Sequence, residues 1–535
     1  MTRRAIPAIA LLVVGLGGIL AVGREAPVRS APLFATADGT WMPAVGVSGA
    51  LSGSWFCPGV PTDDADGVGG EIVVSNGGAE ELIASYAVLT DAGVVTEGEL
   101  SVAARSQARL DVDESADGAS FSSVVVEVEG GRGFVEQIAR HPLGTSVAAC
   151  SNDTSPDWYI ADGYTLDDSV ETLVLTNPFD EPVSADLRFS TESRQAEPGQ
   201  FDGFIVLPRS VRTIRIADLG ARDEPVISVA IEARSGRLVV GRAQEYRGDR
   251  VGYDVSLAAP ALRDQWWFAD GERADGITET FSVYNPTDEE VEVTVFFGGL
   301  PLSATGVNER DPIVVPPRRV VVYDPTVVTG EAGTSGDADP PGTEAPDATA
   351  PDGSAPADGE GTDDEEGADD DAFVEFDDPS LELPVGRHAT VFSTLAQPSI
   401  VVERVLTRPS GDSISTTVVQ GATVRPPNGF VASAWRVGVG PTEPTEDALV
   451  VWNIDQVPST VSVSVIGPDG ASVVPSLSEI PLAEGAIATI DLVDPELLGR
   501  ELVVSATTQV FVERSLPRGG DLAGRSGSWP LPQAG

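Results

Sequence analysis

Short runs of alternating apolar and polar residues, rich in Val, Ile and Thr, recur along most of the chain and are separated by Gly, Asp and Asn. Such runs predict β-strands, because successive side chains of a strand point to opposite faces of the sheet. In the first third of the chain the pattern predicts strands over 71–75, 84–89, 100–112, 123–129 and 133–139. Many short strands at this spacing are typical of antiparallel sandwiches, so we predict an all-β protein.

The pattern itself repeats. The stretch WYIADGYTLDDSVETLVLTNPFD from Trp158 recurs almost position for position as WWFADGERADGITETFSVYNPTD from Trp266, and looser copies begin at Trp55 and Trp435. Each copy contains an aromatic strand, a polar loop, an alternating apolar strand and a turn opened by an asparagine. We therefore predict four tandem immunoglobulin-like antiparallel β-sandwich repeats. The four turn residues are Asn76, Asn177, Asn285 and Asn453.

The repeats are expected at 53–152, 153–262, 263–427 and 428–535. The third is longer because a run rich in Pro, Gly, Ala and Asp, at about 329–372, interrupts it. This acidic insert has too few apolar residues to form a core and is expected to be disordered. Each repeat ends in a similar short segment (SVAACS, SLAAPA, STTVVQGA, SWPLPQA). That similarity favours a closely coupled rod or arc over four beads on a flexible string.

Each repeat is expected to close with a hairpin, which in the second crosses Ser235-Gly236. Glutamates recur in these closing strands, and two of them are followed by arginine. Because neighbours in a strand point to opposite faces, we interpret them as exposed ladder pairs. The lead tryptophans recur at one topological position, so we interpret them as core or joint anchors, with sugar stacking as the alternative. The closing-strand residues are Glu136, Glu403-Arg404 and Glu513-Arg514.

Residues 1–24 begin with Arg3 and Arg4, followed by an apolar run over 5–22. This predicts a signal peptide or an N-terminal membrane anchor, with the rest of the chain outside the membrane. A lead-in rich in Pro, Ala and Gly is expected over 25–52. In an oxidising compartment the two cysteines, Cys57 and Cys150, are expected to form a disulfide, with two free thiols as the alternative.

The formal net charge is −50, from 83 acidic and 33 basic residues, and every basic residue is arginine. Such a chain repels phosphates, which excludes nucleic acid as an expected partner. The two histidines, His141 and His388, lie far apart and lack the spacing of zinc ligands. No nucleophile motif is present. We therefore expect no cofactor, no metal site and no catalytic residue.

The Arg-Arg-apolar N-terminus, the W-x-x-A-D-G stretches, the N-P-x-D turns and the V-E-R closing strands together resemble an uncharacterised family of secreted or membrane-anchored actinobacterial proteins, classed under a domain of unknown function. The resemblance implies no activity. We predict a non-catalytic, extracytoplasmic, envelope-associated scaffold or binding protein. It would meet the membrane through its N-terminal segment and bind an envelope protein or cell-wall glycan. Two alternatives stay open: a carbohydrate-binding module array using exposed aromatics, and a glycan-active hydrolase with a carboxylate pair.

Overall fold

The computed structural model describes residues 52–533 apart from 300–311, 327–382, 395–398, 424–431, 441–446, 521–524 and positions 64, 117, 131, 132, 220, 495, 496, 498, 518 and 520. The predicted signal or anchor at 1–24, almost all of the lead-in and the acidic insert lie outside the described residues. Within these residues the regular elements are β-strands and short 3-10 turns, which confirms the all-β prediction. A search of the same residues for a membrane-crossing helix finds none of sufficient length and apolarity.

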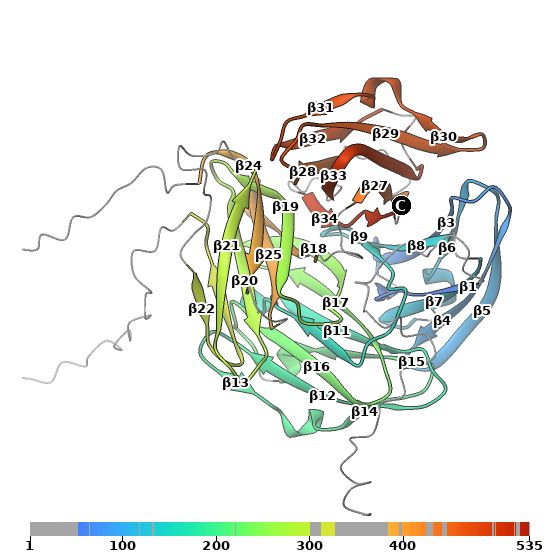
Figure 1. Cartoon of the computed structure of the whole chain (residues 1–535). Helices are drawn as coiled ribbons and strands as arrows, with labels where there is room; N and C mark the ends of the chain where they lie inside the picture. Colours follow the sequence, from blue (N-terminus) through green and yellow to red (C-terminus); the bar gives the residue numbers. More distant parts are fainter. Residues whose placement is uncertain are drawn as a thin grey trace, which may run out of the picture.

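Four lobes surround a common centre (Figure 1). Lobe 1 comprises residues 52–151, lobe 2 155–259, lobe 3 263–422 and lobe 4 432–532. In each of the first three lobes the strands form an outer and an inner sheet. The outer sheets have the orders β1-β7-β4-β5, β10-β16-β12-β13 and β19-β24-β21-β22, and the inner strands pair in the orders β6-β3-β8-β9, β15-β11-β17-β18 and β23-β20-β25-β26.

The strands of lobes 1 and 2 have the following bounds. Lobe 1 contains β1 (Ser52–Phe56), β2 (Val60–Pro61), β3 (Gly69–Asn76), β4 (Leu82–Thr90), β5 (Gly93–Val102), β6 (Ser106–Asp111), β7 (Phe121–Glu129), β8 (Gly133–His141) and β9 (Gly144–Ala149). Lobe 2 contains β10 (Asp157–Ile160), β11 (Val170–Asn177), β12 (Val183–Ser190), β13 (Gln195–Ala196), β14 (Phe204–Val206), β15 (Ser210–Arg215), β16 (Ser228–Ser235), β17 (Val239–Tyr246) and β18 (Arg250–Leu257).

Lobes 3 and 4 complete the set, together with the short 3-10 turns. Lobe 3 contains β19 (Gln265–Arg273), β20 (Thr278–Asn285), β21 (Val291–Gly298), β22 (Ile313–Val315), β23 (Arg319–Tyr323), β24 (Gly386–Ser393), β25 (Val401–Ser410) and β26 (Ser413–Gln420). Lobe 4 contains β27 (Ala432–Val437), β28 (Asp447–Asn453), β29 (Ser459–Gly467), β30 (Gly470–Val473), β31 (Ile480–Leu482), β32 (Ile487–Leu492), β33 (Leu502–Pro517), β34 (Arg525–Ser528) and β35 (Leu531–Pro532). The 3-10 turns are η1 (Asp113–Ser115), η2 (Leu166–Asp168), η3 (Gly199–Phe201), η4 (Ile216–Leu219) and η6 (Pro475–Leu477).

The predicted closing hairpins are wrong: in lobes 1, 2 and 3 the two strands lie in opposite sheets, and in lobe 4 they form a single strand. In lobe 2, β16 belongs to the outer sheet and β17 to the inner sheet, so the Ser235-Gly236 link crosses between layers. In lobe 4 the two runs form one strand, β33, whose first part pairs with β27 and β29 and whose second part pairs with β28 and β34. A period of two fixes which face of a strand is buried but not which neighbour it pairs with.

The strand order also differs from that of an immunoglobulin sandwich, in which strands A, B, E and D share one sheet and C, F and G the other. Here the first strand, β1, pairs with β7 in the sheet that holds β4, while β8 pairs with β3. The first and the closing strands have therefore exchanged sheets relative to the immunoglobulin order.

The last strands of lobes 1, 2 and 3 lie at the centre together with β34 of lobe 4. Strands β18 and β26 pair in parallel, which joins the inner sheets of lobes 2 and 3 into one eight-stranded sheet. Strand β9 lies beside both β18 and β34, and β26 also lies beside β34. Lobe 4 therefore packs on lobe 1, through a buried cluster of Val73, Ile138, Val147, Val439 and Leu516. The chain closes into a ring, where the sequence predicted a rod or arc.

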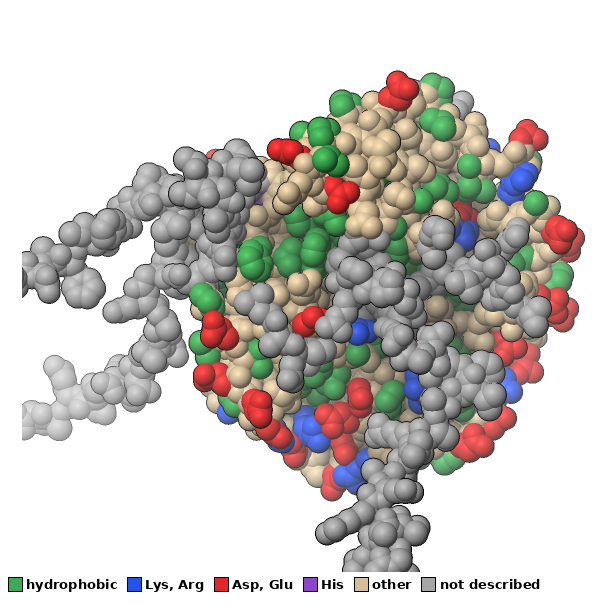
Figure 2. Space-filling view, viewed as in Figure 1, with side chains coloured by type: hydrophobic (Ala, Val, Ile, Leu, Met, Phe, Trp, Pro, Cys, Tyr) green, Lys and Arg blue, Asp and Glu red, His purple; other side chains and the backbone are tan. Residues whose placement is uncertain are grey.

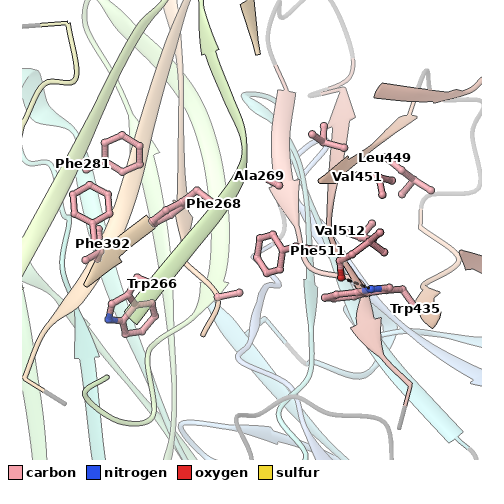
Figure 3. Close-up of a cluster of buried hydrophobic side chains, with 14 of the residues drawn as sticks. Trp266, Phe268, Ala269, Phe281, Phe392, Trp435, Leu449, Val451, Phe511 and Val512 are labelled. Atoms are coloured by element: carbon pink, nitrogen blue, oxygen red, sulfur yellow. Dashed lines mark hydrogen bonds between the residues drawn. The ribbon is translucent and has the colours of Figure 1, made fainter. Parts of the chain in front are cut away.

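The apolar cores lie between the sheets of each lobe. Trp55 belongs to the core of lobe 1 and Trp158 to that of lobe 2, while lobes 3 and 4 share one continuous cluster that holds Trp266 and Trp435. Figure 3 shows this shared cluster, with Phe511 of lobe 4 facing the aromatic group of lobe 3. Continuity of the core across two lobes makes their joint part of the folded interior.

Candidate functional site

The four lead tryptophans are buried, with exposed fractions of 3% or less. The indole N–H of Trp158 donates to the carbonyls of Ser155 and Leu238, both at 3.1 Å, and that of Trp266 donates to Ile400 at 2.9 Å. A buried ring whose N–H is bound to backbone presents no face on which a sugar could stack. These four residues are core anchors of the strands that carry them.

The four turn asparagines are also buried and make one recurring set of hydrogen bonds. The Nδ2 of Asn177 donates to the carbonyls of Glu181 (2.8 Å) and Leu207 (3.0 Å), and its Oδ1 accepts from the amide of Phe179 (3.0 Å). Asn76, Asn285 and Asn453 repeat this pattern with their own turns. Each asparagine therefore satisfies buried backbone groups that the turn leaves without partners.

The recurring glutamates of the closing strands are buried, so their interpretation as exposed ladder pairs is wrong. Glu136, Glu403 and Glu513 are each at most 2% exposed. The inner sheets face the lobe core on one side and the neighbouring lobe on the other, so both faces of these strands are covered. The glutamates point across the joints between lobes.

The W-x-x-A-D-G stretch of one lobe holds the glutamate of the next. Glu403 of lobe 3 accepts hydrogen bonds from the amides of Ala161 (3.2 Å) and Asp162 (2.6 Å) in lobe 2, and it pairs with Arg242 of lobe 2 at 2.8 Å. Two adjacent amides and a guanidinium satisfy a carboxylate that would otherwise be costly to bury.

The joints between lobes 3 and 4 and between lobes 4 and 1 use the same device. Glu513 accepts from the amides of Ala269 and Asp270, both at 3.0 Å, and pairs with Arg404. Glu136 accepts from the amide of Gly440 at 2.8 Å. In the sequence, buried ion pairs at these joints are indicated by glutamate followed by arginine within an apolar strand. Neighbouring residues of a strand point to opposite faces, and when both faces of the sheet are buried water cannot solvate either charge.

The joint between lobes 1 and 2 has neither the glutamate nor the arginine of the other joints. Gly241 occupies the position of the glutamate in β17, and a Cβ built there would lie 2.3 Å from the carbonyl oxygen of Pro58. Proline has no N–H to donate to a carboxylate. Gln137 of β8 occupies the position of the arginine. Its Oε1 accepts from the backbone amide of Gly59 at 3.0 Å, and its Nε2 donates to the carbonyl of Gly59 at 2.8 Å. The first joint is therefore built from backbone packing.

Burial also shifts the acidity of the joint carboxyls. Desolvation raises the pKa of Glu403, and the charge of Arg242 opposes this rise. Glu171 is fully buried beside the same arginine, and no described residue donates a hydrogen bond to its carboxyl oxygens. Desolvation raises the pKa of Glu171 well above its usual range, and the nearby Glu403 and Asp162 add to the rise. The interior of this joint favours a neutral carboxyl at Glu171.

Cys57 and Cys150 form a disulfide, as expected from the sequence. The bridge lies at the end of lobe 1, where Phe56 and Ser151 exchange backbone hydrogen bonds of 2.7 and 2.8 Å. It ties the first strand of the lobe to the segment that leaves it. In the chain-entropy account, closing a loop of 93 residues stabilises the fold by roughly 4–5 kcal/mol.

The two histidines lie in different lobes, His141 at the end of β8 in lobe 1 and His388 in β24 of lobe 3. His141 stacks on Tyr253, with ring centroids 4.3 Å apart. His388 is buried in lobe 3, where its Nε2 lies 2.7 Å from the carboxylate of Glu279. The described residues contain no group of three or more His, Cys, Asp or Glu side chains suited to a metal ion.

The candidate binding site is a cleft between lobes 1 and 2, which we call the joint 1/2 cleft. It has a volume of about 680 Å³, within the usual range for ligand sites. The outer sheet of lobe 1 forms one wall, and the turn after β11, with Arg209, forms the other. Acidic side chains are spread over the rim of the ring (Figure 2). Those that line the cleft are Glu97, Glu99, Glu127, Asp180 and Glu181.

Arg209 is the one basic side chain among the described residues that line the cleft. Its guanidinium pairs with Glu97 at 2.6 Å, and its backbone amide donates to the carbonyl of Phe179 at 2.9 Å. Arg209 adopts the left-handed backbone conformation, with φ of 44°. Phe179, 39% exposed, is a partly open aromatic side chain at the same edge. The cleft therefore combines an apolar edge with an excess of carboxylates.

Residues 141–263 match the model of a family described as a family of unknown function (DUF5719). The match begins at the last residue of β8 and covers β9 and lobe 2, which confirms for this part of the chain the predicted resemblance to an uncharacterised family with a domain of unknown function. No curated protein matches the chain.

Two solved structures show distant likenesses. Trypsin-activated alpha-2-macroglobulin from Escherichia coli is 9% identical over 91% of this chain and 42% of that chain, with a TM-score of 0.12. A tetra-tandem repeat in the extending region of a large adhesion protein is 11% identical over 85% of this chain and 93% of that chain, with a TM-score of 0.07. Likenesses at these scores carry no argument about fold or function.

Proposed function

We propose that this protein is a non-catalytic binding scaffold of the cell envelope, built from four tandem sandwich repeats that close into a ring. The four repeats would be the four lobes. The first three are immunoglobulin-like in having two sheets but not in strand order, and the strands of lobe 4 form one sheet. The N-terminal segment would hold the ring outside the membrane, and the disulfide supports an oxidising compartment.

One observation carries this proposal: the side chains that recur from lobe to lobe are used to build the ring. The lead tryptophans fill cores, the asparagines satisfy turns, and the glutamates bind the amides of the preceding lobe. A carbohydrate-binding array would need recurring aromatic groups that face solvent. The burial of all four tryptophans therefore counts against the array of exposed aromatics.

The binding role is assigned to the joint 1/2 cleft, which lies at the joint that lacks the glutamate and arginine. An envelope protein or a cell-wall glycan is the proposed partner class. We propose no catalytic role, because the sequence contains no G-x-S-x-G nucleophile elbow.

The test is retention of envelope fractions on the immobilised full chain. One column receives isolated envelope polysaccharides, and another receives detergent-solubilised envelope proteins with and without prior protease digestion. We expect saturable, protease-sensitive retention from the protein fraction. Cell fractionation with a membrane-impermeant label on the chain checks its location. Turnover of glycan fragments by the purified chain, or recovery of an unlabelled chain from the cytoplasm, would contradict the proposal.

A further inference from the structure

We propose that the joint 1/2 cleft is a receptor for the guanidinium group of an arginine side chain on a partner polypeptide. The inference deepens the binding role proposed above and rests on it. It follows from a comparison of two equivalent joints within the same chain.

The outer surface of joint 2/3 is built like that of joint 1/2. Arg318 corresponds to Arg209: each follows a turn asparagine at similar spacing and has a positive φ, of 53° and 44°. The backbone amide of each arginine also donates to the carbonyl of the second residue after that asparagine. The acceptor is Thr287 for Arg318, at 3.0 Å, and Phe179 for Arg209, at 2.9 Å. Each pairs across its joint with a glutamate, Arg318 with Glu197 and Arg209 with Glu97.

Strand register identifies the remaining equivalents. In lobe 2, Asp186 of β12 pairs with Glu232 of β16. In lobe 1, Ser85 of β4 pairs with Glu127 of β7. Ser85 and Asp186 each lie nine residues after the turn asparagine of their own lobe, so they occupy equivalent positions. Their partners Glu127 and Glu232 are therefore equivalent, and so are the residues two positions after Ser85 and Asp186. Those two residues are Ala87 in lobe 1 and Arg188 in lobe 2.

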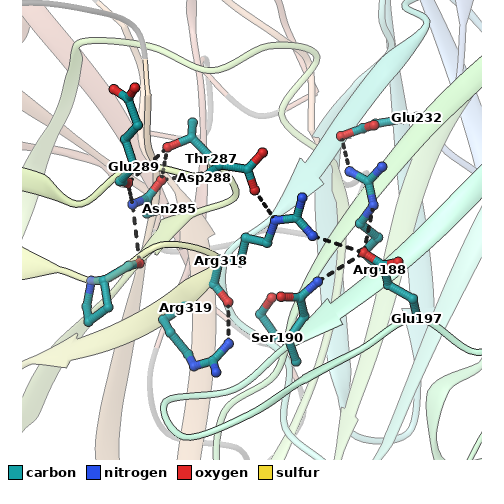
Figure 4. Close-up of polar contacts among 12 residues, drawn as sticks. Arg188, Ser190, Glu197, Glu232, Asn285, Thr287, Asp288, Glu289, Arg318 and Arg319 are labelled. Atoms are coloured by element: carbon teal, nitrogen blue, oxygen red, sulfur yellow. Dashed lines mark hydrogen bonds and ion pairs between the residues drawn. The ribbon is translucent and has the colours of Figure 1, made fainter.

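Arg188 occupies the space between the carboxylates of joint 2/3. Its guanidinium lies 2.7 Å from Glu232 and 3.2 Å from Glu197, which also accepts from Arg318 (Figure 4). A planar guanidinium can donate to two carboxylates at once, which an ammonium group matches less well. Joint 2/3 thus has an arginine of its own between its carboxylates, one of which also binds lobe 3 through Arg318.

In joint 1/2 the equivalent residue, Ala87, leaves that space open. Glu127 and Glu99, which stand on either side of Ser85 in the sheet, have no described hydrogen-bond or ion-pair partner. The cleft therefore presents carboxylates around a space that a guanidinium fills in the neighbouring joint. A ligand that supplies this group would complete the cleft, and an acidic chain attracts such a basic partner.

The test uses a blocked Gly-Arg-Gly tripeptide and its citrulline counterpart, which has the same shape but no charge. Calorimetry or ligand-observed NMR on the full chain should show saturable binding of the arginine peptide at one site, weakened by salt. The citrulline peptide should bind at least about tenfold more weakly, the change expected for losing a charged hydrogen-bonded pair. Equal binding of the citrulline peptide would overturn the proposal.

Two variants locate the site. Ala87→Arg should fill the cleft from within and abolish peptide binding while keeping the melting temperature of the parent chain, and Glu127→Gln should weaken binding about tenfold. Binding unchanged in both variants would overturn the proposal. The converse variant, Arg188→Ala, should open an equivalent cleft and raise the stoichiometry from one to two. A stoichiometry of one in folded Arg188→Ala would overturn the comparison between joints.

Failure of this inference is distinguishable from failure of the scaffold role. If the arginine peptide does not bind but envelope proteins are still retained by the Ala87→Arg chain, the receptor assignment falls and the scaffold stands. If the peptide binds but no envelope fraction is retained, the chemistry of the cleft stands and the proposed function falls.

Discussion

The carboxylate of Glu513 in lobe 4 lies 2.6 Å from the guanidinium of Arg404 in lobe 3, and both side chains are buried. The pair spans the joint between two lobes that share one core. Buried ion pairs of this kind contribute little beyond an apolar substitute, but removing one partner leaves an uncompensated charge in the interior. The pair therefore fixes how the lobes meet.

Removal of the carboxylate should be severe. Glu513→Ala removes the closer of the two carboxylates near buried Arg404 and leaves only Glu279, at 3.9 Å. It also deprives the amides of Ala269 and Asp270 of their acceptor. We expect a loss of about 3–5 kcal/mol in the free energy of unfolding, measured by urea denaturation. The control is Glu129→Ala, at an exposed position of β7, which should change stability by less than about 0.5 kcal/mol. Similar results for both variants would show that the joint does not depend on the pair.

A glycine-to-alanine change should be harmful at Gly241, because a Cβ there would overlap the carbonyl oxygen of Pro58. We expect Gly241→Ala to destabilise the chain by about 1–3 kcal/mol, the usual cost of overpacking. Gly199 has open space around its Cβ position, so Gly199→Ala should be neutral or slightly stabilising. Thermal unfolding of the two variants side by side tests the packing of joint 1/2.

The recurring asparagines should be needed for stability. Asn177→Ala removes the donor from the buried carbonyl of Val206 and the partly buried carbonyl of Leu207. We expect a loss of about 1–3 kcal/mol in unfolding free energy. Asn177→Asp keeps the acceptor oxygen for the amide of Phe179 but removes the donor, so it should also destabilise. A fully stable Asn177→Asp would contradict the assigned hydrogen bonds.

Stability should fall as pH rises, because burial raises the pKa of Glu171 in the folded chain. A carboxyl whose folded pKa exceeds its unfolded pKa binds its proton more tightly when folded. Its contribution is present below the unfolded pKa, about 4.3 for glutamate, and is lost as pH rises through the folded pKa. Glu171→Gln keeps the size but cannot ionise, so it should be more stable than the parent at pH 8. Unfolding measured between pH 5 and pH 8 should show a shallower slope for the variant, whereas parallel curves would contradict the assignment.

The sequence by itself determined the local features of this protein. Alternation of apolar and polar positions predicted the strands, and the recurrence of Trp158 and Asn177 in other copies marked positions that the structure buries. Two cysteines in a chain with an export-like N-terminus predicted the disulfide. These features depend on neighbours along the chain or on a recurring pattern, so they can be recognised without knowing which strands pair.

Only the tertiary structure decided which strands pair and where the lobes meet. The run ending at Ser235 and the run that follows it look like a hairpin in the sequence but lie in different sheets. The alternation of apolar and polar residues shows which face of a strand is buried but not which strand it pairs with. Glu403 looks solvated in its own strand, yet the amides that bind it belong to a segment 241 residues away along the chain. Ala87 and Arg188 are equivalent residues that differ in size and charge. The sequence does not show why this difference matters, because the carboxylates near the two positions come from separate strands. Contacts between distant segments depend on how whole lobes pack, and no local pattern encodes that geometry.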